Sequence, residues 1–487
     1  MTPTDRHHHD RRWAILALLG VAQLMVVLDA TIVNIALPSA QKGLHFTDDN
    51  RQWIVTAYAL AFGSLLLLGG KLGDLFGRKW TFIVGLLGFA GASALGGAAG
   101  SFGVLVAARA LQGVFGAILA PSALSLLTTT FTDPGERAKA FGIFGAIAGG
   151  GAAIGMLLGG VLTETLSWRW CLYVNLLFAL PAAMAAFTLL RNPPRAAGRS
   201  RLDLLGTGLA TSGLFALVYG FSSAETHGWG AGLTVAMLVG GALALMGFVA
   251  WQRRSDHPLL PLRVVLDRNR GGSYLAIGIA GAGMFGVFLF LTYYLQRNLG
   301  FSPIQSGLAF LPLSAVIITT ATFATTKLVP RYGARSLMTT GMLIAAAGML
   351  VLTQLGVHST YAGGVLPALL LQALGMGLIF APAMSGATLG VAPSDAGVAS
   401  AMVNTSQQVG GSIGTAILST LANTAASSYL AVRQPSPAAG LAAAVHGYTT
   451  AFWWAAGIFT VGALVTGLVM RSGVPQHAPL GEPVPAH

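Results

Sequence analysis

The sequence predicts an all-α membrane protein with about fourteen membrane-spanning helices. Of its 487 residues, 54% are hydrophobic and only 9% are charged, whereas a soluble domain carries about 25% charged residues. Its apolar residues also lie in long runs, and about 20 such residues cross the hydrocarbon core of a bilayer as a helix. A chain with so few charges cannot cover water-facing domains, so we expect lipid to be its main solvent.

Fourteen apolar runs are long enough to be spans. They cover residues 13–37, 53–72, 80–99, 102–128, 140–162, 170–190, 204–222, 231–252, 272–295, 305–326, 337–357, 362–387, 398–423 and 448–470. An even number of spans puts both ends of the chain on one side of the membrane. We therefore expect tails at 1–12 and 471–487 on that side.

The basic residues indicate which side this is. Of 27 Lys and Arg residues, the loops opposite the termini hold only Lys42, Arg51, Arg169, Arg297 and Arg433. Because cytoplasmic loops are enriched in Lys and Arg, both termini are predicted to be cytoplasmic, in the cell inner (plasma) membrane. The net charge of +12 thus reflects membrane topology, and we expect no nucleic-acid partner.

The chain also repeats itself weakly. Lys71-Leu72 is echoed by Lys327-Leu328, and Ala120-Pro121 by Ala381-Pro382, at an offset of about 260 residues. Chance matching of apolar sequences is the alternative. Matched loop charges favour two six-helix bundles, 13–190 and 271–470, an architecture typical of rocking-bundle transporters. Residues 191–270 are then basic loops that hold two inserted spans, 204–222 and 231–252.

Four motifs in order resemble a known family. Leu28–Pro38 resembles the first-helix motif of the fourteen-spanner drug:proton antiporters of the major facilitator superfamily, and Gly70–Lys79 matches the superfamily's signature loop. Arg109–Gly113 and Trp168–Asn175 match its motifs in spans 4 and 6. The resemblance covers the whole chain and implies the major facilitator fold, with drug export driven by proton entry.

The span-5 antiporter motif departs from the family. It comprises Gly151, Gly155, Gly159 and Gly160, but Met156 stands where proline is expected, which leaves the direction of transport open. Glycines three or four residues apart let helices pack backbone to backbone. Close packing between the two bundles and ordinary helix association explain these glycines equally well.

Two charged residues stand well inside spans, Asp29 and Arg109. Each costs about 2.5–3.5 kcal/mol at a helix centre on insertion scales. At 1.5 Å per residue, Asp29 lies about 24 Å from the inner face and Arg109 about 10 Å from the outer face, at similar depth. We expect a facing pair that couples transport to protons; a purely structural bond between two helices is the alternative.

The signature loop is predicted to be a conformational gate, made of Gly70, Asp74, Gly77, Arg78 and Arg137. Glycine permits the short turn with little steric cost, and a carboxylate suits a guanidinium or a helix N-terminus. The resemblance implies that this cluster latches the inner ends of the bundles, and we expect Arg137 to be the partner of Asp74. A charge cluster that only sets topology is the alternative.

Polar and aromatic side chains of both halves are candidates for the substrate cavity, since aromatic rings offer apolar area and can face a cation. The candidates are Asn34, Tyr58, Gln112, Phe285, Phe288, Tyr293, Asn404 and Gln408. For each residue taken singly, packing against helices or lipid is the alternative role.

The sequence favours a secondary active exporter of lipophilic drugs or antibiotics, neutral or singly cationic, that is a monomer and not an enzyme. Its partners are the substrate, protons and the lipid bilayer, with the proton as coupling ion and no cofactor or metal. The alternatives are a proton-coupled importer or uniporter of a metabolite, a membrane receptor, and a membrane enzyme. No Gly-x-x-x-x-Gly-Lys-Ser/Thr phosphate loop is present, so ATP is not expected to be the fuel.

Overall fold

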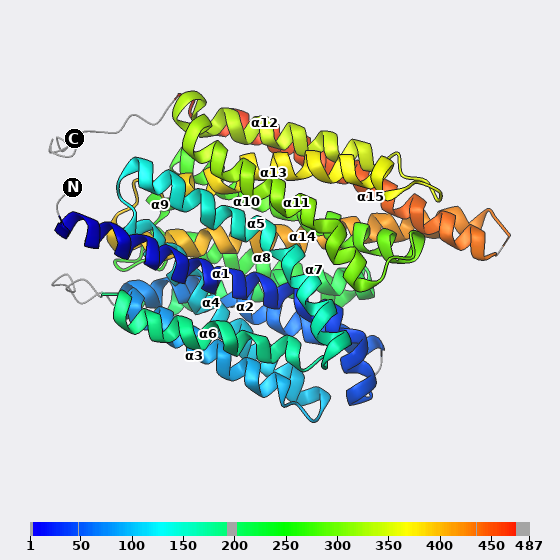
Figure 1. Ribbon diagram of the computed structural model, residues 1–487, viewed down its shortest axis with the longest axis horizontal. Coiled ribbons are helices and arrows are strands. Elements are labelled where there is room, and N and C mark those ends of the chain that lie inside the picture. The colour runs from blue at the N-terminus through cyan, green and yellow to red at the C-terminus, as the bar shows by residue number, and fades with distance from the viewer. Residues whose placement is uncertain (1–2, 47, 192–201, 435, 474–487) are drawn as a thin grey trace.

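The computed structural model describes residues 3–46, 48–191, 202–434 and 436–473. In this part of the chain every regular element is a helix. The long helices run side by side along the long axis of the molecule, and α1 begins at the same end at which α15 finishes (Figure 1).

Six helices of the first half form one bundle: α1 (Pro3–Leu44), α2 (Asp48–Phe76), α3 (Arg78–Gly97), α4 (Phe102–Thr130), α5 (Pro134–Thr165) and α6 (Trp170–Leu189). Six helices of the second half form the other: α10 (Arg268–Tyr293), α11 (Pro303–Phe323), α12 (Val329–Leu352), α13 (Leu366–Thr388), α14 (Ala396–Ala431) and α15 (Pro437–Val469). Between the halves lie α7 (Leu204–His227), α8 (Gly232–Gln252) and the short α9 (Leu262–Leu266). Brief helical turns complete the list: η1 (Tyr294–Asn298), η2 (Ala324–Leu328), η3 (Tyr361–Val365) and η4 (Pro393–Asp395).

Each span predicted from the sequence falls on a helix, but the predicted number of fourteen is not confirmed. Among the described residues, eleven helices are long and apolar enough to cross a membrane, or twelve when the bent α5 is taken as one span. One of the eleven, Ile304–Leu352, is 49 residues long. Within the predicted tail 1–12, α1 is already helical from Pro3.

The internal repeat is visible in two glycines. Gly77 separates α2 from α3 with φ 97°, and Gly333 interrupts α12 with φ 76° and ψ 158°. Only glycine adopts such angles without strain. Each glycine lies six residues after the paired lysines Lys71 and Lys327 of the repeat. Both halves therefore turn at the equivalent point through a glycine with positive φ.

The two bundles pack on each other through equivalent helices. The second helix of each half lies against the fifth helix of the other, α2 against α14 and α11 against α5. Small residues allow this contact: a Cβ on Gly145 of α5 would lie 2.8 Å from Cα of Ala381 in α13. The seam between the bundles is therefore formed by backbones in close approach.

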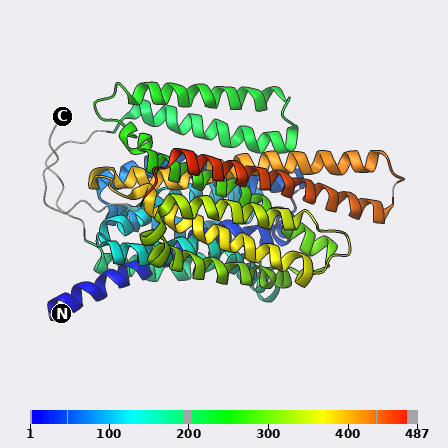
Figure 2. The same cartoon turned by 90° about the horizontal axis from the view of Figure 1, so that it is seen from above.

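The inserted helices α7 and α8 form a separate layer outside both bundles (Figure 2). α7 packs on α2 and α14, so it covers the seam between the bundles, and α8 packs on α7. A shared apolar cluster joins these helices and the loop after α8. Its members include Leu67 of α2, Leu214 of α7, Phe248 of α8, Val398 of α14 and Leu259 of the loop. The pair is thus attached to both halves at once.

Asp203 joins the first turn of α7 to the last turn of α8. Its carboxylate accepts hydrogen bonds from the N–H of Gly206 (2.8 Å), Nε1 of Trp251 (2.9 Å) and Nε2 of Gln252 (2.8 Å). Burial raises the pKa of Asp203, but these hydrogen bonds outweigh it, so its pKa lies below the ordinary value. A depressed pKa means that this stabilisation is present at neutral pH and is lost as the pH falls through the acidic range.

We therefore predict that Asp203→Ala loosens the α7–α8 pair without unfolding the bundles. Hydrogen bonds to a charged group contribute about 1.5–3 kcal/mol each, and the exposed Asp256 in the following loop provides a matched control. Hydrogen-exchange mass spectrometry should show faster exchange over 204–252 in Asp203→Ala and unchanged exchange in Asp256→Ala. Equal exchange in both variants would contradict the role of Asp203.

Candidate functional site

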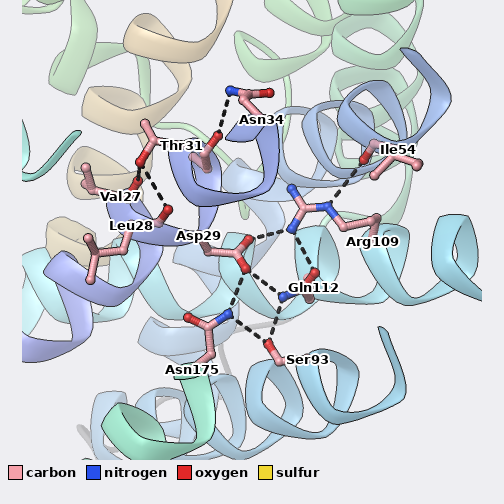
Figure 3. A network of polar contacts seen from close by, with 11 residues as sticks. Val27, Leu28, Asp29, Thr31, Asn34, Ile54, Ser93, Arg109, Gln112 and Asn175 are labelled. Carbon is pink, nitrogen blue, oxygen red and sulfur yellow. Dashed lines mark hydrogen bonds and ion pairs between the residues drawn. The ribbon is translucent and has the colours of Figure 1, made fainter. Parts of the chain in front are cut away.

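The centre of the first bundle holds one buried carboxylate, Asp29 of α1, which is 0% exposed. Its Oδ2 accepts from Nη1 of Arg109 at 2.6 Å, and its Oδ1 accepts from Nε2 of Gln112 and Nδ2 of Asn175, each at 2.8 Å (Figure 3). Ser93 of α3 accepts from both amides. Four helices thus converge on one carboxylate.

Arg109 is held as firmly as its partner. It lies three residues before Gln112 on the same face of α4, and its Nη1 also donates to Oε1 of Gln112 at 2.8 Å. Its Nε donates to the carbonyl of Ile54 in α2 at 3.3 Å, and its guanidinium lies 4.4 Å from the centre of the Tyr58 ring. The pair expected from the sequence is present, as a single hydrogen-bonded ion pair inside the first bundle.

Two members of this network were not among the predicted site residues, Ser93 and Asn175. A serine or asparagine in an apolar run is common and carries little signal by itself. Asn175 belongs to the span-6 motif, and that position was the one available hint. The burial of both side chains, 0% for Ser93 and 1% for Asn175, identifies them only in the folded chain.

Three of the four glycines of the span-5 motif pack within their own bundle, so of the two roles left open for this motif ordinary helix association fits these three. Added Cβ atoms on Gly151, Gly155 and Gly159 would meet Val27, Leu28 and Ile32 of α1, at 3.1, 3.2 and 2.9 Å respectively. Only Gly160 faces the other half, at Ile304 of α11. A four-residue spacing keeps the first three on one face of α5, directly behind the helix that carries Asp29.

The predicted cavity residues of the first half do not share a cavity. Tyr58 (7% exposed) and Gln112 (0%) belong to the buried Asp29 network. Asn34 is exposed, and its amide donates to the carbonyl of Ala30 at 3.4 Å, pointing away from Asp29 (Figure 3). Asn34 lies on the other side of α1 from the carboxylate, because residues five apart on a helix do not share a face.

The predicted cavity residues of the second half are also dispersed. Phe288 packs against Phe310 with ring centres 5.2 Å apart, and Tyr293 is exposed beneath the guanidinium of Arg297. Asn404 donates to the carbonyl of Ser400, and Gln408 lies against Gly63 on the seam with α2. The side chain of Phe285 lies outside the described residues. Of this set, Gln408 alone is placed here at the contact between the bundles.

At one end of the seam, Asp74 of α2 joins the two halves. Its Oδ1 accepts from the backbone N–H of Gly397 in α14 at 3.1 Å and from Nη2 of Arg78 at 3.3 Å, and Arg78 also donates to the carbonyl of Pro393. The helices touch here, since a Cβ on Gly70 would lie 2.5 Å from the carbonyl oxygen of Gly397. Gly70, Asp74 and Arg78 thus contact the second bundle, and Gly77 forms the turn between α2 and α3.

Arg137 is not the partner of Asp74, and this expectation was wrong. Its guanidinium donates to the carbonyl of Ser385 at 3.2 Å and to Oγ1 of Thr388 at 2.7 Å, both in the last turn of α13. A cation at a helix C-terminus is favourable for the same electrostatic reason as an anion at an N-terminus. Arg137 therefore makes a second contact between the bundles. It lies at a helix C-terminus, whereas Asp74 lies at a helix N-terminus.

A comparison of the two halves explains why the first turn of α14 has a backbone N–H available for Asp74. In the first half Asp133 caps its own helix α5, accepting from the N–H groups of Gly135 (2.9 Å) and Glu136 (3.0 Å). Its counterpart Asp395 makes no such cap and instead forms an ion pair with Arg263 at 2.7 Å. The N–H of Gly397 is thereby left for Asp74, which caps α14 from the other bundle.

Proteins similar to this chain include two that are named for antibiotic resistance or export. The puromycin resistance protein pur8 of Streptomyces alboniger is 52% identical over 95% of this chain and 92% of that protein. The cephamycin export protein CmcT of Amycolatopsis lactamdurans is 41% identical over 83% of this chain and 84% of that protein.

The fold has solved counterparts as well. The human organic anion transporter MFSD10 (TETRAN) superposes with a TM-score of 0.64 over 96% of this chain and 100% of that one, at 15% identity, a likeness of fold alone. Residues 19–415, most of both bundles with the inserted helices between them, match the Major Facilitator Superfamily. The chain belongs to the major facilitator superfamily of membrane transporters.

Proposed function

We propose that this protein is a secondary active exporter that exchanges protons for lipophilic drugs or antibiotics. The observation that carries the proposal is a fully buried Asp29–Arg109 pair in a chain whose close relatives are named for antibiotic resistance and export. Intramembrane charges are costly and mark ion or substrate pathways. The proton is the coupling ion in this proposal, and no cofactor or catalytic step is involved.

Asp29 is the proposed proton carrier. It is the carboxylate at the centre of the first bundle, and its helix lies against the glycine face of α5, which in turn contacts α11 of the other bundle. A change in charge at Asp29 therefore acts on the helix beside the seam. Removing one partner of a buried ion pair costs about 3–5 kcal/mol, enough to shift a balance between two arrangements of the bundles.

One carboxylate supports the exchange of one proton for a neutral or singly cationic substrate. A proton that enters yields about 1.4 kcal/mol per pH unit and about 2.3 kcal/mol per 100 mV of membrane potential. Both drive the export of a neutral molecule. For a monocation the exchanged charges cancel, so only the pH gradient remains. A metabolite importer, suggested by Met156, is the alternative, and the names of the relatives favour export.

The same proposal includes fourteen spans with cytoplasmic termini in the inner (plasma) membrane, in a monomer. The break at Gly333 divides the 49-residue stretch Ile304–Leu352 into two spans. α14 adds another, because its 36 residues exceed the length needed to cross a bilayer. The basic loops at the end where both termini lie favour the cytoplasmic side.

The Asp74 contact is the proposed inner gate. It must open whenever the cavity faces the cytoplasm, so its strength sets how readily the transporter leaves the closed state. Arg78 and Arg137 make the other contacts that open in the same step.

We predict that Asp29→Asn abolishes uphill export and leaves some downhill exchange, because the neutral amide cannot carry a proton. In reconstituted vesicles, an imposed pH gradient and an imposed potential are applied separately, with a panel that includes puromycin. Loss of uphill transport under both drives is expected. Uphill transport at the wild-type rate would make Asp29 structural and this mechanism wrong.

We predict that Asp74→Asn inserts and folds normally but slows export roughly tenfold, because the loss of about 1.4 kcal/mol from the contact lowers the ratio of the inner-closed to the inner-open state by about that factor. Asp133→Asn is the matched control, since it changes a cap within one bundle and asparagine caps as well as aspartate. In a Cys171→Ser background, a cysteine at the buried Ser400 of α14 should react faster with thiol reagent only when Asp74 is changed. Wild-type export by Asp74→Asn would remove the gating role.

We predict that α7 stays outside the substrate path. Single cysteines at Ala210, Leu214 and Val218, which face the bundles, should label at the same rate with and without substrate. The control is a cysteine at Gln408 on the seam. Protection by substrate along α7 would place it on the path instead.

A further inference from the structure

The side chain of Asn175 holds an unused acceptor beside the proposed proton carrier. Its Nδ2 donates to Oδ1 of Asp29 at 2.8 Å and to Oγ of Ser93 at 3.3 Å. Its Oδ1 is buried and has no hydrogen-bond partner. A buried acceptor without a donor is unfavourable, which suggests that this oxygen is used in another protonation state of the site.

The donors around Asp29 suit its ionised form only. Arg109, Gln112 and Asn175 each direct an N–H at the carboxylate. A protonated carboxyl group carries an O–H that needs an acceptor, and none of these three groups presents one to Asp29 as they stand. Binding of a proton therefore requires one neighbour to exchange its donor for an acceptor.

Asn175 can make this exchange because its Oδ1 accepts no hydrogen bond that the rotation would break. A half-turn of its amide swaps Nδ2 and Oδ1, which brings the oxygen to the place facing Asp29 and Ser93. The Ser93 hydroxyl can then donate where it now accepts. The same rotation of Gln112 would break its bond to Arg109 (2.8 Å) and turn an amide N–H toward the guanidinium, so Gln112 is the amide that stays in place.

We infer that Asn175 is a positioning residue for the proton on Asp29, donating to the ionised carboxylate and, after a half-turn, accepting the O–H of the protonated one. The inference rests on the proposed function of Asp29. The proton binds at Oδ1 of Asp29 and leaves from it, so the carboxyl changes from −1 to neutral while Arg109 keeps its charge.

The groups that face Asp29 come from every neighbouring helix. The titratable or charged ones among the described residues are Arg109 of α4, Tyr58 of α2 and Cys171 of α6. α3 presents the Ser93 hydroxyl, and Gly155 of α5 lies against Leu28 and Thr31 of α1. None of these supplies a free acceptor at hydrogen-bond distance from the carboxylate, whereas Asn175 does so by rotation alone.

Infrared difference spectra of the reconstituted protein, recorded between acid and alkaline pH, test the inference. A side-chain amide C=O band should shift to lower frequency on acidification, because Oδ1 gains a donor, and the shift should vanish in Asn175→Leu and in Asp29→Asn. Ser93→Ala, a small change in a buried helix, should alter the frequency of the shifted band. If Asn175→Leu still showed the wild-type shift of the amide band, or if the band were unaltered in Ser93→Ala, the inference would be overturned.

The pH dependence of export supplies a second readout with a matched control. Gln112→Met removes a donor from the ionised form and should raise the midpoint by about one pH unit. Asn175→Leu removes a bond from both forms and should move it by less than half as much. An equal rise in both variants would reduce Asn175 to a simple donor while Asp29 remains the carrier. Uphill export by Asp29→Asn would instead overturn the proposed function.

Discussion

The arrangement of the first bundle depends on one constraint: the negative charge of a carboxylate buried in a lipid-embedded bundle must be compensated. Asp29 is reached by no solvent, and an uncompensated charge there is costly. Three donors from α4 and α6 provide the compensation. These donors are held in turn by a hydroxyl from α3, which accepts from the two amides, and by the ring of Tyr58 from α2 beside Arg109. Five of the six helices of the first bundle are thereby fixed in rotation about one point.

The second half of the repeat carries no such constraint at the equivalent place. At the offset of about 261 residues that relates α4 to α13, the position of Arg109 is occupied by Leu370. The two bundles are alike in their helix order and in the turns at Gly77 and Gly333. They differ in the chemistry of this position, where the first bundle has an arginine and the second a leucine.

The contacts between the bundles use the unpaired ends of helices. Asp74 accepts from the first turn of α14, and Arg137 donates to the last turn of α13. Helix ends have backbone groups with no partner inside the helix, so a side chain of the other bundle can satisfy them and release them again. These polar contacts add to the close packing of small residues along the seam.

The class of protein, the place of each long helix, the internal repeat and the Asp29–Arg109 pair could be predicted from the sequence, because these depend on local apolar length and on the rarity of charges in lipid. The partners of Arg137, the face of α5 on which Gly155 lies, and the entry of Ser93 and Asn175 into the site emerge only in the folded chain. Each residue turns a helix by about 100°, so a small rotation set by distant packing changes every partner. Side-chain partners are therefore properties of the assembled bundle, while spans are properties of the chain.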